Sequence, residues 1–317
     1  MDSLRNSLPV VIPAYQRPEK VIKRYAEIIE WSRLEKLYIS VDAPRSIASE
    51  TETLRNELVL KVSEDLAEKD TRVELLVWNK NFGVNNLLAN VIKATKQYCG
   101  LIVIEDDLAV THQTLDFLAD NYEKAGSKAA TGHVRYSHLN LSPTISRIST
   151  FPLQWGLAFN SDVMSCYIEV QKNAKFERKI IQKVFYKNFK EYLSNLQIER
   201  LTQWWFNHFY FCYKHGNWAD AILQYSVYAS GGFYRAPSRS LIEDDAVLFD
   251  ERSMTLRTKP HQIEYCDRGV IQGSSGDYFC LKCELESSHL HEANLRNLIG
   301  ATKHRRFTEI HNKFMQH

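Results

Sequence analysis

The chain has 317 residues, and its 40 Lys and Arg against 38 Asp and Glu give a formal net charge of +2. A charge so close to zero excludes a polyanion binder that acts through bulk charge alone, and it excludes an acidic disordered tail. The chain is rich in aromatic residues, with 15 Phe, 16 Tyr and 6 Trp, and has only 12 Gly. This composition is typical of a packed enzyme rather than of a repeat or fibrous protein.

The sequence shows no targeting segment. No apolar run approaches the roughly 18 residues that a membrane span needs, and residues 1–6 (MDSLRN) lack the basic head and apolar core of a signal peptide. The 6 cysteines do not resemble a disulfide framework in a chain of this length. We therefore expect a reduced, cytoplasmic protein, which would serve the cell envelope from the inside.

Short apolar runs alternate with amphipathic segments in the first half of the chain. The expected strands are residues 8–12, 37–41, 73–78 and 101–104, and the expected helices are residues 18–29, 54–66, 84–98 and 112–122. This alternation predicts a mostly parallel α/β sheet, in which ligands bind at the carboxyl ends of the strands. Polar clusters follow three of these strands, at residues 15–17, at Asp42 and at residues 105–107.

The second half of the chain has a different character. Residues 169–200 form a lysine-rich segment with helical periodicity, and an aromatic cluster follows at residues 204–211. We expect this cluster to belong to the core, with an acceptor platform as the alternative. Residues 294–317 have the pattern of an amphipathic helix with one basic face, which would either pack on the domain or lie on a membrane surface.

Three adjacent carboxylates, Glu105, Asp106 and Asp107, directly follow the apolar run 101–104. These side chains repel one another, and a divalent cation relieves the repulsion because Mg²⁺ and Mn²⁺ prefer hard oxygen ligands. The bound ion could also bridge a diphosphate. The alternative is a solvated acidic turn that caps the next helix. We favour the metal site, because the other polar clusters follow matching strands.

Four motifs occur in order: residues 9–17 (PVVIPAYQR), 40–42 (SVD), 79–83 (NKNFG) and 104–108 (IEDDL). Through them, residues 8–245 resemble the GT-A fold, nucleotide-sugar glycosyltransferases, in particular the bacterial family-2-like enzymes and the N-acetylglucosaminyltransferase I type. The resemblance implies a Rossmann-like, mostly parallel mixed sheet flanked by helices, with a helical C-terminal extension.

The domain boundaries follow from this resemblance. Residues 1–245 would form the GT-A catalytic domain, with a nucleotide-binding half over 1–125 and an acceptor half over 126–245. Residues 246–317 would form a partly helical extension.

The resemblance also implies roles for individual residues. Asp107 would bind the metal directly as part of a DXD-type motif, and Arg17 would meet the donor diphosphate. Asp42 would accept a hydrogen bond from the base, while Gly83 would let the backbone approach the nucleotide. The implied donor-binding residues are Pro13, Ala14, Tyr15, Arg17, Asp42, Asn79, Gly83, Glu105, Asp106, Trp155 and Gly156.

Each of these roles has a simpler structural alternative. Arg17 could be a surface charge at a helix start, Asp42 a turn former and Gly83 a helix-start glycine. Trp155 could pack in the core rather than offer a stacking face to a sugar.

An inverting transferase needs a base that deprotonates the acceptor hydroxyl. The resembled family places this aspartate after a tryptophan and before a strand that leads to a proline-containing turn. Residues 217–220 (NWAD) precede such a segment at 232–237, so Asp220 is the expected base, although Ala219 separates it from Trp218. A helix N-terminal role is the alternative. We expect residues 243–245 (EDD) to be a surface or loop cluster that could otherwise supply the base.

These features predict a metal-dependent, inverting glycosyltransferase that carries Mn²⁺ or Mg²⁺. It would move a hexosyl or N-acetylhexosaminyl group from a UDP-sugar to a glycan or a lipid-linked envelope polysaccharide. We expect a peripheral contact with the inner membrane through the last helix, and no nucleic-acid partner. A nucleotidyltransferase is an alternative that the glycine-free loop at residues 13–18 disfavours. A non-catalytic sugar- or lipid-binding scaffold is another.

Residues 280–283 form a Cys-x-x-Cys pair, with Cys266 before it and His289 and His291 after it. The spacing of the pair fits a zinc knuckle, but the whole set does not match a standard zinc finger. Reduced, partly buried thiols are the simpler expectation.

Overall fold

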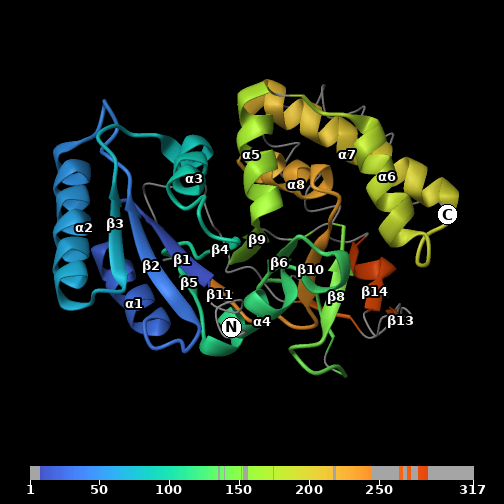
Figure 1. Cartoon of the computed structure of the whole chain (residues 1–317), viewed down its shortest axis with the longest axis horizontal. Helices are drawn as coiled ribbons and strands as arrows, with labels where there is room; N and C mark the ends of the chain where they lie inside the picture. Colours follow the sequence, from blue (N-terminus) through green and yellow to red (C-terminus); the bar gives the residue numbers. More distant parts are fainter. Residues whose placement is uncertain are drawn as a thin grey trace.

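The computed structural model describes residues 8–134, 136–138, 140–150, 152, 156–173, 175–216, 219–244, 264–266, 270–272 and 278–284. Within these ranges, ten strands form one sheet in the order β13-β14-β8-β10-β6-β9-β4-β1-β2-β3 (Figure 1). The strands are β1 (Leu8–Ala14), β2 (Leu34–Val41), β3 (Val73–Val77), β4 (Gly100–Val103), β6 (Ala129–Thr131), β8 (Ser146–Ser149), β9 (Leu157–Asn160), β10 (Tyr234–Pro237), β13 (Val270–Gln272) and β14 (Tyr278–Cys280).

The sheet is mixed, with a parallel part built from the first half of the chain. Strand β1 pairs in parallel with β2 and β4, and β2 pairs in parallel with β3. Strand β9 then lies antiparallel between β4 and β6. The predicted α/β class, with a mixed sheet flanked by helices, is confirmed.

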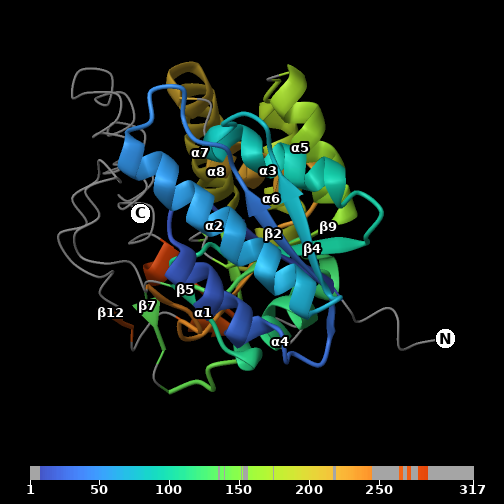
Figure 2. The ribbon, with the colours of Figure 1, turned by 90° about the vertical axis from the view of Figure 1, so that its left-hand side faces the viewer.

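Helices cover both faces of the sheet. They are α1 (Pro18–Ile28), α2 (Glu50–Lys69), α3 (Gly83–Ala94), α4 (His112–Asn121), α5 (Ser161–Asn173), α6 (Arg178–Phe189), α7 (Asn195–Gly216) and α8 (Ala219–Ala229). Alternate residues of the strands face opposite sides: Val11 joins the core under α3 and α5 to α8, while Val10 and Ile12 join the core under α1, α2 and α4. Figure 2 shows α1 and α2 side by side over the first strands.

The lysine-rich segment differs from its prediction as one helical stretch. Residues 169–200 are divided among the end of α5, the whole of α6 and the start of α7. A reciprocal cap starts α7. The Gln197 backbone amide donates to Ser194 Oγ at 3.3 Å, and the Ser194 backbone amide donates to Gln197 Oε1 at 2.9 Å. A serine and a glutamine three positions apart therefore begin a new helix where the periodicity alone suggested continuity.

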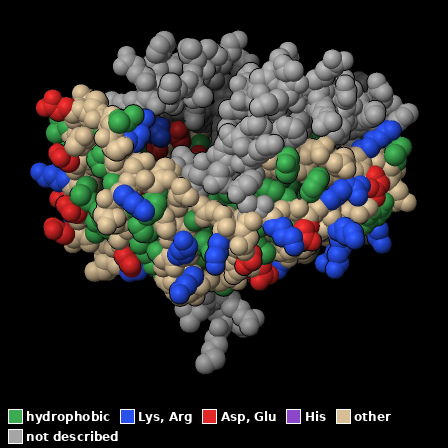
Figure 3. All heavy atoms as spheres, turned by 90° about the horizontal axis from the view of Figure 1, so that it is seen from above, with side chains coloured by type: hydrophobic (Ala, Val, Ile, Leu, Met, Phe, Trp, Pro, Cys, Tyr) green, Lys and Arg blue, Asp and Glu red, His purple; other side chains and the backbone are tan. Residues whose placement is uncertain are grey.

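The aromatic cluster belongs to the core, as expected. Trp204, Trp205 and Phe209 are buried, and the rings of the two tryptophans meet edge to face with centroids 4.8 Å apart. On the face that Figure 3 shows, Lys and Arg side chains are interspersed with Asp and Glu, in keeping with the nearly neutral chain.

In the described part of residues 246–317, β13 and β14 extend the same sheet, while β12 (Glu264–Tyr265) forms a separate two-stranded sheet with β7 (Tyr136–Ser137). Strand β14 pairs with β8 and β13, and residues 281–284 form one helical turn. The helix expected at residues 294–317 lies outside the described residues. Among the helices that the structure describes, none combines the length and apolar character of a membrane span.

A buried ion pair fixes α1 against the segment that follows Asp107. The Arg24 side chain is fully buried and donates to Glu27 Oε1 at 2.9 Å and to the carbonyl of Leu108. Glu27 in turn accepts from the Val110 amide at 3.0 Å. Removing one member of such a pair leaves the other charge without compensation, which costs several kcal/mol.

We therefore expect Arg24→Met to lower the free energy of unfolding by about 3 kcal/mol in chemical denaturation. Arg33→Met is the matched control, because Arg33 pairs with the exposed Asp120 at 2.6 Å and should change stability by less than about 1 kcal/mol. Equal effects of the two substitutions would contradict the role given to Arg24.

Candidate functional site

An arginine and two aspartates from separate strand ends form a buried ion cluster. Asp106 and Asp107 follow β4 and are 3% and 5% exposed, and Arg17 lies between β1 and α1. Arg17 Nε and Nη2 donate to the two Asp106 oxygens at 3.1 and 2.5 Å, and Nη1 donates to Asp107 Oδ2 at 3.2 Å. Because β1 and β4 are parallel neighbours, their carboxyl ends place these charges together.

The charges of this cluster do not cancel. Two carboxylates face the Arg17 guanidinium, while the nearby Arg24 is paired with Glu27. Burial raises the pKa of Asp106 to about 6, although the charges of Arg17 and Arg24 oppose the rise. The remaining negative charge and the carboxylate oxygens suit a hard divalent cation. Asp107 and Asp106 could hold Mg²⁺ or Mn²⁺ if Arg17 shared their oxygens with the ion. The donor set therefore fits the predicted metal.

Asp42 links the end of β2 to the start of α3. Its two carboxylate oxygens accept from the backbone amides of Phe82 and Gly83, each at 2.9 Å. Gly83, the first residue of α3, has a φ of +63°, which favours glycine. The contact of Asp42 with a base stays a prediction, and the observed bonds show that it also caps a helix.

Three residues that the sequence analysis missed hold the loops after β1 and β2. Asn56 of α2 donates to the carbonyls of Tyr15 and Asp42 at 2.7 and 2.8 Å. The Tyr15 hydroxyl donates to Glu52 and accepts from the Arg45 amide at 3.1 Å. The sequence gives little indication of these residues, because they belong to no motif and only the fold brings α2 beside the two loops.

A pocket of about 120 Å³ is lined by Glu105, the residue that precedes Asp106 of the ion cluster in the sequence. Its walls are mostly apolar side chains from β4, α3 and α8, and four of the predicted site residues line it. These four are Pro13, Glu105, Gly156 and Asp220. The structure thus brings Asp220 from the second half of the chain to Glu105 of the first acidic triplet.

Asp220 lies in the first turn of α8. Solvent reaches this residue through the pocket, yet the protein around its carboxyl group raises its pKa to about 6 by desolvation. A carboxyl group of this kind is ionised at neutral pH and is a stronger base than an ordinary aspartate.

We expected the second acidic triplet to be a surface or loop cluster, and Glu243 is exposed. Glu243 and Asp244 form β11 (Glu243–Asp244), which pairs antiparallel with β5 (Leu108–Ala109). This backbone pairing places Glu243 and Asp244 next to the residue that follows Asp107. The sequence did not predict the pairing, because these acidic residues carry no strand pattern. Asp245 lies outside the described residues.

The remaining predicted residues take different positions. Ala14 is buried at the end of β1, and its carbonyl accepts from the Asp42 amide at 3.2 Å, whereas Asn79 is exposed before α3. Trp155 and Trp218 lie outside the described residues.

No known protein family matches the sequence, and no curated protein matches it either. Among solved structures, the chain is similar to TarS of S. aureus at 8% identity and a TM-score of 0.43, over 98% of this chain and 43% of that one. It is also similar to S. aureus TarS 1–349 in complex with UDP-GlcNAc, at 10% identity and a TM-score of 0.40, over 98% and 71% of the two chains.

A cytidylyltransferase from Leptospira borgpetersenii is similar at 12% identity and a TM-score of 0.33, over 59% of this chain and 73% of that one. The chain thus spans less than half of the length of the first TarS structure. At such identities and TM-scores, the similarities assign neither a family nor an activity to this chain.

Gly156 is required by packing at the pocket wall. Its φ is +59°, and a Cβ atom there would lie 2.0 Å from Ile242 Cδ1. The Ile242 side chain cannot swing away freely, because a Cβ at Gly132 would also lie 2.6 Å from it. Two glycines therefore hold the Ile242 side chain between them.

We expect Gly156→Ala to lower the free energy of unfolding by about 3 kcal/mol, from backbone strain and overpacking together. Gly231→Ala is the matched control, because Gly231 has a φ of +83° with no heavy atom within 4 Å of the added Cβ and should cost only about 1 kcal/mol. Chemical denaturation of both variants measures the difference, and equal losses would remove the packing argument.

Proposed function

We propose that the protein is a metal-dependent, inverting glycosyltransferase of the GT-A type. It would transfer a hexosyl or N-acetylhexosaminyl group from a UDP-sugar to a glycan or a lipid-linked envelope polysaccharide. One observation carries this proposal: the buried Asp106–Asp107 pair lies at the carboxyl end of β4, next to a residue that shares a pocket with Asp220. The residues proposed to bind the sugar donor and to activate the acceptor would thus lie at one edge of the sheet.

The ion cluster supports the donor half of the reaction. Asp107 would bind Mn²⁺ or Mg²⁺ with Asp106 beside it, and the bound ion would neutralise charge on the departing diphosphate. Arg17, with its five donors, would orient the diphosphate from the same side. The loop caps at Asp42 and Asn56 support this arrangement, since they fix the backbone on which the donor would lie.

The pocket supports the acceptor half. Asp220 would accept the proton of the acceptor hydroxyl as that oxygen attacks the anomeric carbon of the donor. Its pKa of about 6 keeps it ionised at neutral pH and makes it a stronger base than an ordinary aspartate. The apolar walls would limit the access of water and so favour transfer over hydrolysis.

The alternatives differ in their products. A glycosyltransferase releases the nucleoside diphosphate, a nucleotidyltransferase releases pyrophosphate, and a non-catalytic scaffold releases neither. The proposed inner-membrane contact involves the helix expected at residues 294–317, which lie outside the described residues. Deletion of residues 300–317 should lower binding in vesicle flotation and leave donor hydrolysis intact, and unchanged flotation would contradict the contact.

Asp107→Ala should abolish Mn²⁺-dependent donor binding, because it removes the direct metal ligand. A thermal-shift panel of nucleotide sugars with and without Mn²⁺ measures this, since a ligand that binds only the folded state stabilises it. Asp120→Ala removes an exposed carboxylate from α4 and should keep the full Mn²⁺-dependent shift. Normal binding by the Asp107 variant would remove the metal assignment.

Asp220→Asn should keep donor binding and lower kcat for transfer by about 10²- to 10⁴-fold, as expected for loss of a general base. Asp162→Asn is the control, because Asp162 also lies in the first turn of its helix but pairs with Lys128 at 2.8 Å. Full activity of the Asp220 variant would place the base elsewhere, with Glu243 to Asp245 next in line.

The pH dependence follows from Asp220 and Asp106 together. Wild-type kcat/KM should fall at least tenfold per unit as the pH drops below about 6, because protonated Asp220 cannot act as a base and the pKa of Asp106 is also raised to about 6. The folded protein also holds the Asp220 proton more tightly than the unfolded chain does, so ionised Asp220 costs stability above pH 6. The Asn variant should therefore be no less stable than wild type at pH 8, which separates lost catalysis from lost folding.

A further inference from the structure

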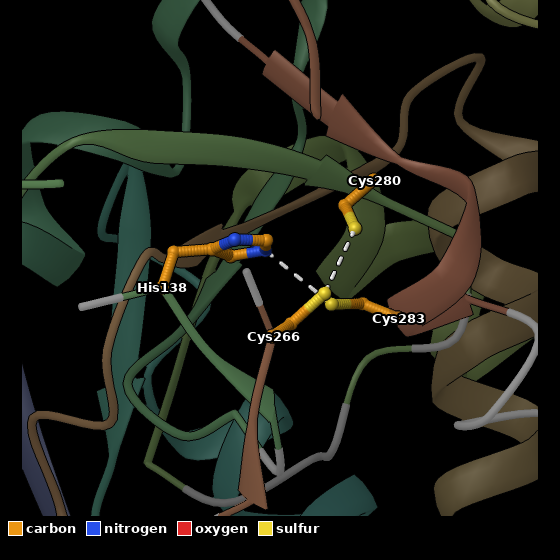
Figure 4. Close-up of side chains that lie close together, drawn as sticks. All are labelled: His138, Cys266, Cys280 and Cys283. Atoms are coloured by element: carbon orange, nitrogen blue, oxygen red, sulfur yellow. Dashed lines mark hydrogen bonds between the residues drawn. The ribbon is translucent and has the colours of Figure 1, made fainter. Parts of the chain in front are cut away.

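Four buried side chains from distant parts of the chain point toward one another beside β14, near the end of the sheet opposite β3. They are His138, Cys266, Cys280 and Cys283 (Figure 4), and their ligand atoms all lie within 4.8 Å of one another. We propose that these residues form a Cys₃His site that binds one Zn²⁺ ion and fastens the C-terminal segments to the sheet. The site is separate from Asp106 and Asp107, and the proposal does not rest on the proposed function.

The distances fit tetrahedral zinc. Four ligands at a Zn–S distance of about 2.3 Å and a Zn–N distance of about 2.0 Å lie roughly 3.5 to 3.8 Å apart along the edges of the tetrahedron. The Sγ atoms of Cys266 and Cys280 are 3.8 Å apart, and Cys283 Sγ lies 3.3 Å from His138 Nε2. These separations also exceed an S–S bond of about 2.05 Å, and all three cysteines are free thiols.

Backbone pairing positions the four ligands before any metal binds. Strand β7 (Tyr136–Ser137) lies parallel to β12 (Glu264–Tyr265), so His138 and Cys266 leave these strands at the same end. The Cys266 amide donates to the Ser137 carbonyl at 3.0 Å. Cys280 ends β14, and the helical turn that follows brings Cys283 back toward it. Two pairs of ligands thus come from two separately paired backbone segments.

A buried cation lies beside the proposed centre. Zn²⁺ with three thiolates and a neutral imidazole carries a net charge of −1. Arg147 of β8 is 2% exposed and pairs in register with Tyr278 of β14; it interacts electrostatically with the buried Glu284 and also with Cys283 and Cys280. Its Nε and Nη1 atoms have no hydrogen-bond partner among the described residues. A buried guanidinium beside the thiols is consistent with an outer shell that stabilises thiolate ligands.

The chemistry of the ligand set indicates a structural role. Four protein ligands fill the tetrahedral positions of zinc and leave none for water or substrate, which is typical of structural sites. Soft thiolates select zinc over the hard cations that Asp106 and Asp107 suit. When Zn²⁺ binds, the three thiols release their protons to solvent, so binding is coupled to folding of this region. The zinc would join the β7–β12 pair, through His138 and Cys266, to the end of β14 in the ten-stranded sheet.

The full-length chain purified under reducing conditions without chelator should contain about one zinc ion per chain by elemental analysis. The double variant Cys280→Ser/Cys283→Ser should retain less than about a tenth of it, because two of the four ligands are gone. Cys212→Ser is the matched control: Cys212 is also buried and its Sγ lies 3.5 Å from His208 Nε2, but it lies outside the cluster, so the zinc content should be unchanged.

A second measurement uses wild-type protein only and holds even if the double variant fails to fold. Exchange of the bound metal for Co²⁺ should give the thiolate-to-cobalt charge-transfer absorption and the intense visible bands of a tetrahedral centre. Protein that is folded and fully reduced but holds no zinc and develops no such bands would overturn the proposal. A disulfide among Cys266, Cys280 and Cys283 in the freshly purified protein, found by non-reducing peptide mapping, would overturn it as well.

Discussion

The contact of Arg17 with Asp106 and Asp107 is the constraint on which the site depends. Two neighbouring carboxylates are buried where the sheet ends, and desolvation and the charge of Asp107 both raise the pKa of Asp106. The guanidinium compensates only one of the two charges, through a geometry that fixes the end of β1 against the end of β4. The parallel pairing of these strands brings Arg17 to the aspartates. The excess negative charge suits a second cation at this edge of the sheet.

The rest of the site is arranged around this edge. Asp42 and Asn56 hold the loops after β1 and β2 through bonds to backbone groups, so the surface beside the ion cluster is fixed by the fold. The pocket then adds Asp220 from α8 to Glu105 from the first acidic triplet. In the proposed reaction, Asp106 and Asp107 would bind the metal and the donor, and Asp220 would remove the proton from the acceptor.

The two proposed metal centres differ in chemistry as well as in place. Carboxylate oxygens at the carboxyl end of β4 suit a hard cation that can also meet phosphate, whereas four buried sulfur and nitrogen ligands suit an ion that stays. In the proposed second centre, zinc would tie the β7–β12 pair to the end of β14, because His138 and Cys266 follow the paired strands and Cys280 ends β14.

The sequence by itself determined the alternation of strands and helices, the parallel first half and the acidic triplet after β4, because periodicity and strand-end chemistry are local properties. It also located the residues that meet at that sheet edge. Only the tertiary structure decided that Arg17 binds the aspartates, that Glu243 and Asp244 pair beside Leu108, and that Asp220 shares a pocket with Glu105. It also placed His138 beside the cysteines, while His289 and His291 lie outside the described residues. His138 and Cys283 are 145 positions apart, and contacts at that distance are set by strand pairing, which no spacing rule along the chain records.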